Sequence, residues 1–200
     1  MDHYAIDPAV SRFTVRAFAT GVFSALGHNP TIAIRDFTGD AEFAPDSLET
    51  ASLHLKIKAN SLAVTDKVSD KDRREMERTM NQEVLETSQY PEIAFDSSSV
   101  SASKAGDGQY FVNLLGNLSL HGVTNSQPVS AQIALTGDML RAHGEFTVKQ
   151  TAYGIKLVSV AGGTLKLKDE LKCTFDIVAR KKAQNSEREP NVLSHSGENH

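Results

Sequence analysis

Apolar and polar residues alternate along most of this chain, and the alternation predicts β-strands. The segment from 109 to 135, QYFVNLLGNLSLHGVTNSQPVSAQIAL, shows the pattern best. Every second residue from Tyr110 to Leu120 is apolar or glycine, and after a polar turn the alternation resumes from Val129 to Leu135. A strand of this kind has one apolar face that must be covered and one polar face that can meet water.

The same pattern predicts further strands on both sides of this segment. They are expected around residues 13–17, 32–43, 53–59, 93–95, 140–148 and 171–179. In the second of these, the apolar residues change parity around Arg35 and Asp36, which indicates a β-bulge or a break. Together the pattern gives about eight sequential strands joined by turns. Such a chain most simply forms an all-β fold, an eight-stranded antiparallel barrel that closes on itself and removes its exposed edges.

One segment, residues 69–87, departs from the alternation. Its sequence, SDKDRREMERTMNQEVLET, is rich in good helix formers and contains no Gly or Pro. Ser69 and Asp72 have the spacing of a capping box, with Asp in place of the usual Glu. Met76, Met80 and Val84 recur every four residues and form a narrow apolar stripe. These features predict one inserted amphipathic helix, lying over the sheet or across one end of it.

The chain divides into a patterned part and a short polar end. Residues 183–200 lack periodicity and are almost wholly polar, so we expect them to form a disordered tail. Residues 1–182 are expected to form one β-barrel domain, since 200 residues is an ordinary length for a single all-β domain.

Composition and charge narrow the function classes. A formal net charge of -4 disfavours a nucleic-acid partner, which usually selects a basic surface. No apolar run approaches the roughly 18 residues of a membrane-spanning helix, so no transmembrane segment is expected. The start, MDHYAIDPAV, has neither a basic region nor an apolar core. A cytoplasmic location is therefore expected for the chain as given, and a periplasmic one if a leader has been removed.

Candidate chemistry is sparse. The seven histidines include no pair at helical spacing and no accompanying cysteine cluster, so no metal site is expected. No nucleophile motif or phosphate-binding loop is present, and we expect no catalytic residues, no enzyme activity and no cofactor. A weaker alternative is an enzyme acting on a lipid head group near His28 or His121. The single cysteine, Cys173, shares the apolar parity of its strand and is expected to be buried.

The open question is what the apolar inner face packs against. An eight-stranded barrel is just wide enough to be filled by side chains or to hold one small ligand. The inward positions mix phenylalanines with small residues such as Gly116 and Ala142. The small residues either match large neighbours in a filled barrel or leave a lumen for an apolar guest. A Gly116→Phe change should block ligand uptake in a hollow barrel and overpack a filled one.

Several segments, in order, resemble the YceI-like family, the polyisoprenoid-binding β-barrel domain. Similar to its motifs are YAIDPAVSRFTVRAF at 4–18, FTGDAEF at 37–43, YPEIAFDSSSV at 90–100, GNLSLHGVTNSQPV at 116–129, KQTAYGI at 149–155 and LKCTFDIVARK at 171–181. The resemblance covers roughly residues 4 to 182. One departure is Lys149 and Gln150, where an Arg and an acidic residue are common in the family.

The resemblance implies an extended, lipocalin-like barrel that holds an amphiphile with a long prenyl chain, such as a quinone or a polyprenyl phosphate. The protein would then be a non-enzymatic binding, sequestering or transport protein whose partner is a hydrophobic small molecule. Its sequence leaves a homodimer open. The residues expected to line the lumen, chosen by parity, are Phe13, Phe43, Leu55, Met76, Met80, Phe95, Leu114, Leu118, Ile133, Phe146 and Phe175.

An alternative from another class is a structural or interaction module. Its barrel would be filled by side chains, and its helix would dock a protein partner. The outward face of residues 69–87 carries Arg73, Arg74 and Arg78, which are the residues expected to make that contact.

Overall fold

Most of the described chain is β-strand. The structure is a computed structural model that describes residues 1–20, 29–44, 47–160 and 165–183. Its strands are β1 (Asp2–Ile6), β2 (Arg12–Arg16), β3 (Ala19–Thr20), β4 (Thr31–Ile34), β5 (Phe37–Ala44), β6 (Ser47–Lys58), β7 (Leu62–Val64), β8 (Glu92–Gly106), β9 (Gln109–Leu120), β10 (Val123–Thr136), β11 (Met139–Lys149), β12 (Ser159–Val160), β13 (Leu165–Leu167) and β14 (Glu170–Lys181). Its helices are α1 (Asp70–Thr79), the π-helix η2 (Met80–Val84) and the 3-10 turns η1 (Ala59–Ser61) and η3 (Gln150–Tyr153). The predicted tail from residue 184 onward and His28 lie outside the described residues.

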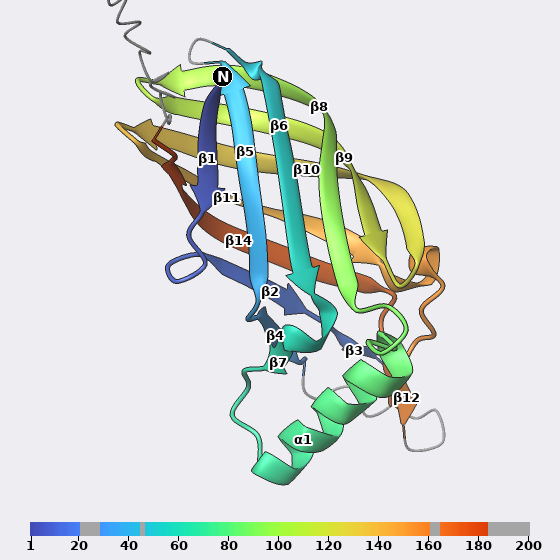
Figure 1. The fold of residues 1–200 in the computed structure, drawn as a ribbon. Coiled ribbons are helices and arrows are strands. Elements are labelled where there is room, and N and C mark those ends of the chain that lie inside the picture. The colour runs from blue at the N-terminus through green and yellow to red at the C-terminus, as the bar shows by residue number, and fades with distance from the viewer. Residues whose placement is uncertain (21–28, 45–46, 161–164, 184–200) are drawn as a thin grey trace, which may run out of the picture.

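The main sheet closes into a barrel through its first and last strands (Figure 1). The ring order is β1-β5-β6-β8-β9-β10-β11-β14, and β1 pairs back onto β14. Tyr4 is opposite Lys181 of β14 on one side and Ala41 of β5 on the other. Each pairing in the ring is antiparallel, so the predicted eight-stranded antiparallel barrel is confirmed.

Three strands of the ring are interrupted and continue beyond the break. β2 follows β1 along β14, β4 precedes β5, and β7 follows β6. The break between β4 and β5 falls at Arg35 and Asp36, where the apolar parity was predicted to slip. The extensions pair in the order β14-β2-β4-β7, so β7 forms an edge of the sheet. A separate small sheet of order β12-β13-β3 also forms.

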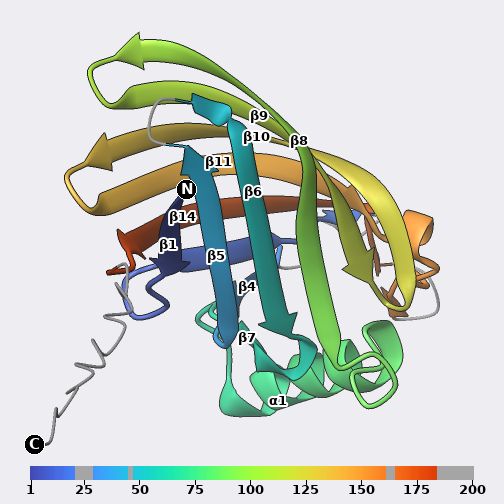
Figure 2. The same cartoon turned by 45° about the horizontal axis from the view of Figure 1, so that its top comes forward.

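The inserted helix lies across the end of the barrel that carries β4 and β7 (Figure 2). Its start is capped as predicted, because Ser69 Oγ accepts a hydrogen bond from the Asp72 N–H at 3.1 Å. The same hydroxyl donates to Asp72 Oδ2 at 2.7 Å. After Thr79 the α-helix widens into η2, which the four-residue spacing of its apolar stripe did not predict.

Two side chains of α1 complete the free edge of β7. Glu77 Oε1 accepts the Val64 N–H at 2.9 Å. Arg73 donates to Val64 O at 3.1 Å and to Asp66 O at 3.2 Å. Because a strand edge exposes unpaired backbone donors and acceptors, these two side chains satisfy groups that a neighbouring strand would otherwise satisfy.

An ion pair on the outer face gives a first prediction. His54 Nδ1 lies 2.7 Å from Asp96 Oδ1, and this hydrogen bond, helped by Asp40 and Glu42, raises the pKa of His54. A raised pKa means that the imidazolium stabilises the fold below the ordinary pKa of histidine, and that this stabilisation is lost as pH rises through the folded value. We therefore expect His54→Gln to lower the melting temperature by about 1–3 °C at about pH 5.5 and to have no effect at about pH 9. An equal effect at both pH values, measured by circular dichroism, would contradict this assignment.

Candidate functional site

A cavity occupies the inside of the barrel. Its volume is about 270 Å³, counted as the space open to the centres of water molecules. An apolar cavity of about 150 Å³ in another protein is enough to bind benzene, and small-molecule sites start at about 300 Å³. Residues from all eight strands of the ring contribute to its wall, together with residues of η2. The barrel is therefore neither a wide pore nor a completely filled core.

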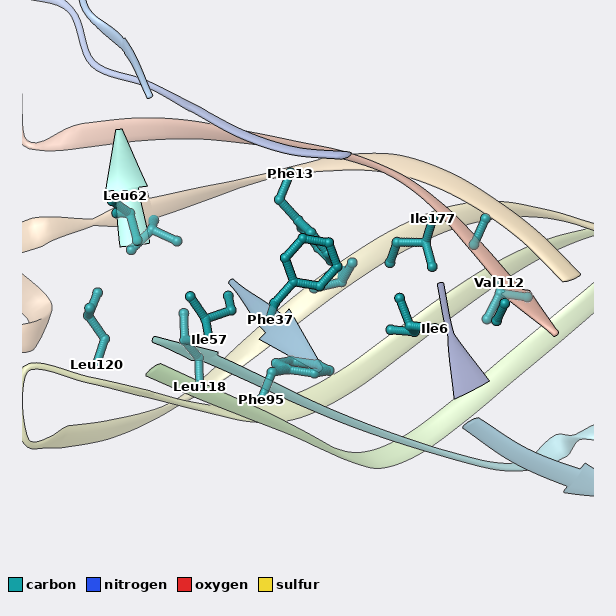
Figure 3. Packing of buried hydrophobic residues seen from close by; sticks show 14 of the residues in the cluster. Ile6, Phe13, Phe37, Ile57, Leu62, Phe95, Val112, Leu118, Leu120 and Ile177 are labelled. Atoms are coloured by element: carbon teal, nitrogen blue, oxygen red, sulfur yellow. The ribbon is translucent and has the colours of Figure 1, made fainter. Parts of the chain in front are cut away.

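The cavity is long and narrow. On β9 its wall runs from Val112 to Leu120, which at about 3.3 Å per residue is about 26 Å along the strand. For the usual strand tilt of 35–45°, this corresponds to about 20 Å along the barrel axis. Figure 3 shows Leu120 and Leu62 at one end of the row of inward side chains and Val112 and Ile177 at the other. The shape suits an extended chain better than a compact molecule.

Aromatic side chains meet in the middle of this row. Figure 3 places Phe13, Phe37 and Phe95 between its two ends. The rings of Phe13 and Phe37 are edge to face with their centroids 4.9 Å apart. Phe175 lies beside Phe13, with 6.3 Å between the ring centroids. Edge-to-face and tilted pairs at these distances are favourable, so the rings support one another. Phe13 and Phe175 lie on the cavity wall, whereas Phe37 does not.

The wall is almost entirely apolar and carries no charged residue among those described. Its polar members are Thr14, Ser52, Gln150 and Thr174. The described chain buries three polar residues, Ser11, Gln127 and Gln150, and of these only Gln150 lines the cavity. Cys173 also lines it, and burial raises the pKa of its thiol to about 12. At neutral pH the described wall therefore presents no ionised group to a guest.

Most of the residues predicted to line a lumen lie on this wall. These are Phe13, Phe43, Leu55, Met80, Phe95, Leu114, Leu118, Ile133, Phe146 and Phe175. Met76 is half-buried on α1 and is not part of the wall. Its neighbour Glu77 binds the edge of β7, and the helix reaches the cavity only from Met80 onward, through Val84 and Leu85.

Other wall residues were missed by the sequence reasoning. Ile57, Leu120 and Ile177 share the inward parity of the chosen residues, and the alternation could have identified them. Gln150 also continues the inward parity, two residues after Val148, but it is polar and follows the last residue of β11, so the apolar pattern did not identify it.

The small inward residues serve two different purposes. A Cβ added to Gly116 would lie 2.6 Å from Phe95 Cε2, and one added to Gly144 would lie 2.6 Å from Phe175 Cζ. These glycines are thus covered by aromatic rings, an arrangement known to protect glycine in sheets. Ala131 and Ala142, in contrast, line the cavity. A phenylalanine at position 116 would therefore collide with Phe95 rather than plug the lumen of an intact barrel.

His121 is held on both sides of its ring. Its Nδ1 donates to the Tyr153 carbonyl at 3.1 Å, and its Nε2 lies 2.7 Å from Glu86 Oε2. The Tyr90 ring packs beside it, with 4.4 Å between the ring centroids. Both ring nitrogens are thus used within the protein, and the side chain ties the segment after η2 to the β9–β10 turn and to η3.

Within the ranges that the structure covers, no three His, Cys, Asp or Glu side chains gather where they could hold a metal ion.

Comparison with known proteins identifies the family. The model of the YceI-like domain matches residues 4–179. This chain belongs to the YceI-like domain family. That family includes polyisoprenoid-binding domains. No curated protein sequence matches the chain.

Solved structures share the fold of this YceI-like protein. BcnA of Burkholderia cenocepacia superposes with a TM-score of 0.65 at 19% identity, over 86% of this chain and 98% of that one. A polyisoprenoid-binding domain from Saccharophagus degradans, implicated in plant cell wall breakdown, gives 0.64 at 14% identity, over 90% and 98%. The YceI protein of Campylobacter jejuni gives 0.58 at 15% identity, over 78% and 88%. At these identities the likeness shows the fold and not the ligand.

The outward face of α1 in this YceI-like protein is largely occupied by internal contacts. Arg73 binds the edge of β7, and Arg78 pairs with Glu75 at 2.8 Å and with Glu83 at 3.1 Å. Of the three arginines predicted to dock a partner, only Arg74 makes no hydrogen bond or ion pair to a described residue. In the described part of the chain, none of the helices has the length and apolar character needed to cross a membrane.

Proposed function

We propose that this YceI-like protein binds the apolar chain of a prenyl-type lipid inside its barrel, and sequesters or carries that lipid without changing it. The observation that carries the proposal is the long cavity whose described wall is apolar and uncharged. Burying an alkyl-like chain gains about 0.8 kcal/mol per CH₂ group. A guest about 20 Å long would thus be held mainly by contact with the wall.

Packing energetics support a guest over an empty barrel. Protein interiors are normally close-packed, and atoms that line a void lose their attractive contacts on that side. Phe95 and Phe175 already fill the space over the inner glycines, yet the cavity remains between them and the opposite walls. A chain lying along the cavity would restore contacts for these side chains. That a domain of the same fold is described as polyisoprenoid-binding supports a prenyl chain as the guest.

Direct extraction tests the proposal. The protein is purified under native conditions, extracted with organic solvent, and the extract is analysed by mass spectrometry. We expect a prenyl lipid in amounts comparable with the protein, or uptake of farnesol by protein that has been delipidated and refolded. Absence of both would contradict the proposed function.

A cavity-narrowing variant gives the second prediction. Ala142 lines the cavity opposite Ile133 and Ile177, so Ala142→Leu should reduce farnesol affinity at least about tenfold, which corresponds to 1.4 kcal/mol. The matched control is Ala134→Leu, because Ala134 pairs with Arg141 on the outer parity of β10 and is not on the wall. This control should bind farnesol like the unchanged protein. Titration calorimetry measures both affinities, and equal binding by the two variants would place the ligand outside the barrel.

A further inference from the structure

Gln150 is the one buried polar side chain of the described residues that reaches the cavity. Its exposed fraction is 4%, and it begins η3 directly after β11. The segment around it is firmly held, because the Gln150 N–H donates to Asp169 O at 3.0 Å. Thr151 adds two bonds to the Asp169 carboxylate, from its N–H at 2.8 Å and from its hydroxyl at 2.6 Å. These hydrogen bonds, that of the Thr151 hydroxyl above all, lower the pKa of Asp169, so its carboxylate stays ionised and keeps the segment in place.

The orientation of the Gln150 amide follows from the hydrogen bonds that its Nε2 donates. Nε2 lies 2.9 Å from the Lys168 carbonyl oxygen and 3.5 Å from that of Asp169. Since an amide carries its oxygen on the opposite branch from its nitrogen, Oε1 is turned away from both carbonyls. No described residue donates a hydrogen bond to it. On a side chain that is only 4% exposed, an acceptor without a described donor is open to a hydrogen bond from a guest, and a donor on the guest would complete this site.

Because the described wall carries no charged residue, it limits which donor the guest can bring. A phosphate buried here would give up its water without meeting a cation from the described wall, which is strongly unfavourable. An ether or ester head group has no hydrogen to donate to Oε1. A hydroxyl is small, uncharged and a donor, and thus satisfies both conditions.

We propose that Gln150 recognises an uncharged long-chain alcohol of the polyprenol type by accepting a hydrogen bond from its hydroxyl at Oε1. The proposal rests on the proposed function, since it names the head group of the same guest. The chain of the alcohol lies along the apolar wall, and its hydroxyl lies at the end of the cavity formed by η3.

Three probes that share one prenyl chain test the head group. Delipidated protein is titrated with farnesol, farnesyl methyl ether and farnesyl phosphate. One hydrogen bond is expected to make farnesol bind about 2- to 12-fold more tightly than the ether, and the phosphate should bind most weakly. Gln150→Leu should bind farnesol and the ether equally. The control is Gln127→Leu, which removes a buried glutamine away from the cavity wall and should keep the preference for farnesol.

The outcomes separate the two proposals. If no probe binds, the proposed function fails. If the probes bind but the phosphate or the ether equals or exceeds farnesol, the inference fails while the proposed function stands. Survival of the farnesol preference in Gln150→Leu also overturns the inference. If Gln150→Leu does not fold, the ranking of the three probes on the unchanged protein decides whether the inference about the head group holds.

Discussion

Replacing Gly116 with alanine is expected to lower the free energy of unfolding by about 1–3 kcal/mol. The added Cβ would lie 2.6 Å from Phe95 Cε2 and 2.7 Å from the Asp96 carbonyl oxygen, so both the ring and the neighbouring strand must shift. The larger Gly116→Phe change should prevent folding. Urea denaturation followed by circular dichroism measures the loss for Gly116→Ala.

A second glycine of the same barrel provides the control. A Cβ at Gly106 of β8 would meet nothing closer than Gln109 Oε1 at 3.7 Å. Gly106→Ala should therefore change the unfolding free energy by no more than about 0.5 kcal/mol. In a Phe95→Leu background, Gly116→Ala should cost less than in the unchanged protein, because the shorter side chain leaves room for the methyl group. Equal losses of unfolding free energy for Gly106→Ala and Gly116→Ala would show that the Phe95 ring does not press on Gly116.

Cys173 is expected to react with a disulfide reagent about 1,000-fold more slowly at about pH 8 than an exposed cysteine. Its pKa is raised from 9.0 to about 12 by burial, and only the thiolate attacks. Because three units of pKa reduce the thiolate about 1,000-fold, the rate should still rise about tenfold per pH unit above about pH 9, where an exposed thiol levels off. The absorbance of released thionitrobenzoate follows the reaction.

The matching control moves the thiol to the outside of the barrel. A double variant, Cys173→Ser with Ser101→Cys, places it at an exposed position on β8 and should react at the ordinary rate. Urea should bring the native cysteine to the same rate. Fast reaction of Cys173 in the folded protein would show that solvent enters the cavity freely.

The alternation of the sequence was sufficient to predict the barrel wall. Side chains of one parity, such as Phe146 and Cys173, face each other across neighbouring strands and point into the cavity. This works because the two-residue period is a local property of each strand. The shift at Arg35 and Asp36 was readable for the same reason, since a break in the period is also local.

Features that depend on distant parts of the chain were not predictable. β1 has only Tyr4 and Ile6 as buried residues, too few to establish an alternation, and its partner Lys181 lies near the other end of the sequence. Whether Gly116 leaves a void or makes room for a ring depends on where Phe95 lies. The position of Gln150 on the wall depends in the same way on its tertiary partners.

The hydrogen bonds from Gln150 to the Lys168 and Asp169 carbonyls show most clearly what the sequence pattern could not predict. In the sequence it has the same parity as Val148, but it is polar and stands beside Lys149, so the apolar pattern does not place it on the wall. Only the approach of Lys168 and Asp169 shows that its amide nitrogen is occupied and its oxygen is turned away. The wall of the cavity was thus predictable from local pattern, whereas its polar end required the fold.

The contacts between α1 and β7 bear on where a guest would enter the barrel. In the described chain no backbone-to-backbone hydrogen bond joins α1 or η2 to a strand, and the edge of β7 is held by Arg73 and Glu77 alone. Swinging the helix outward would break these side-chain contacts and expose the buried Met80 and Leu85, but would leave the hydrogen bonds between the strands intact. Under the proposed function, a lipid would leave or enter at that end while the rest of the barrel stays folded.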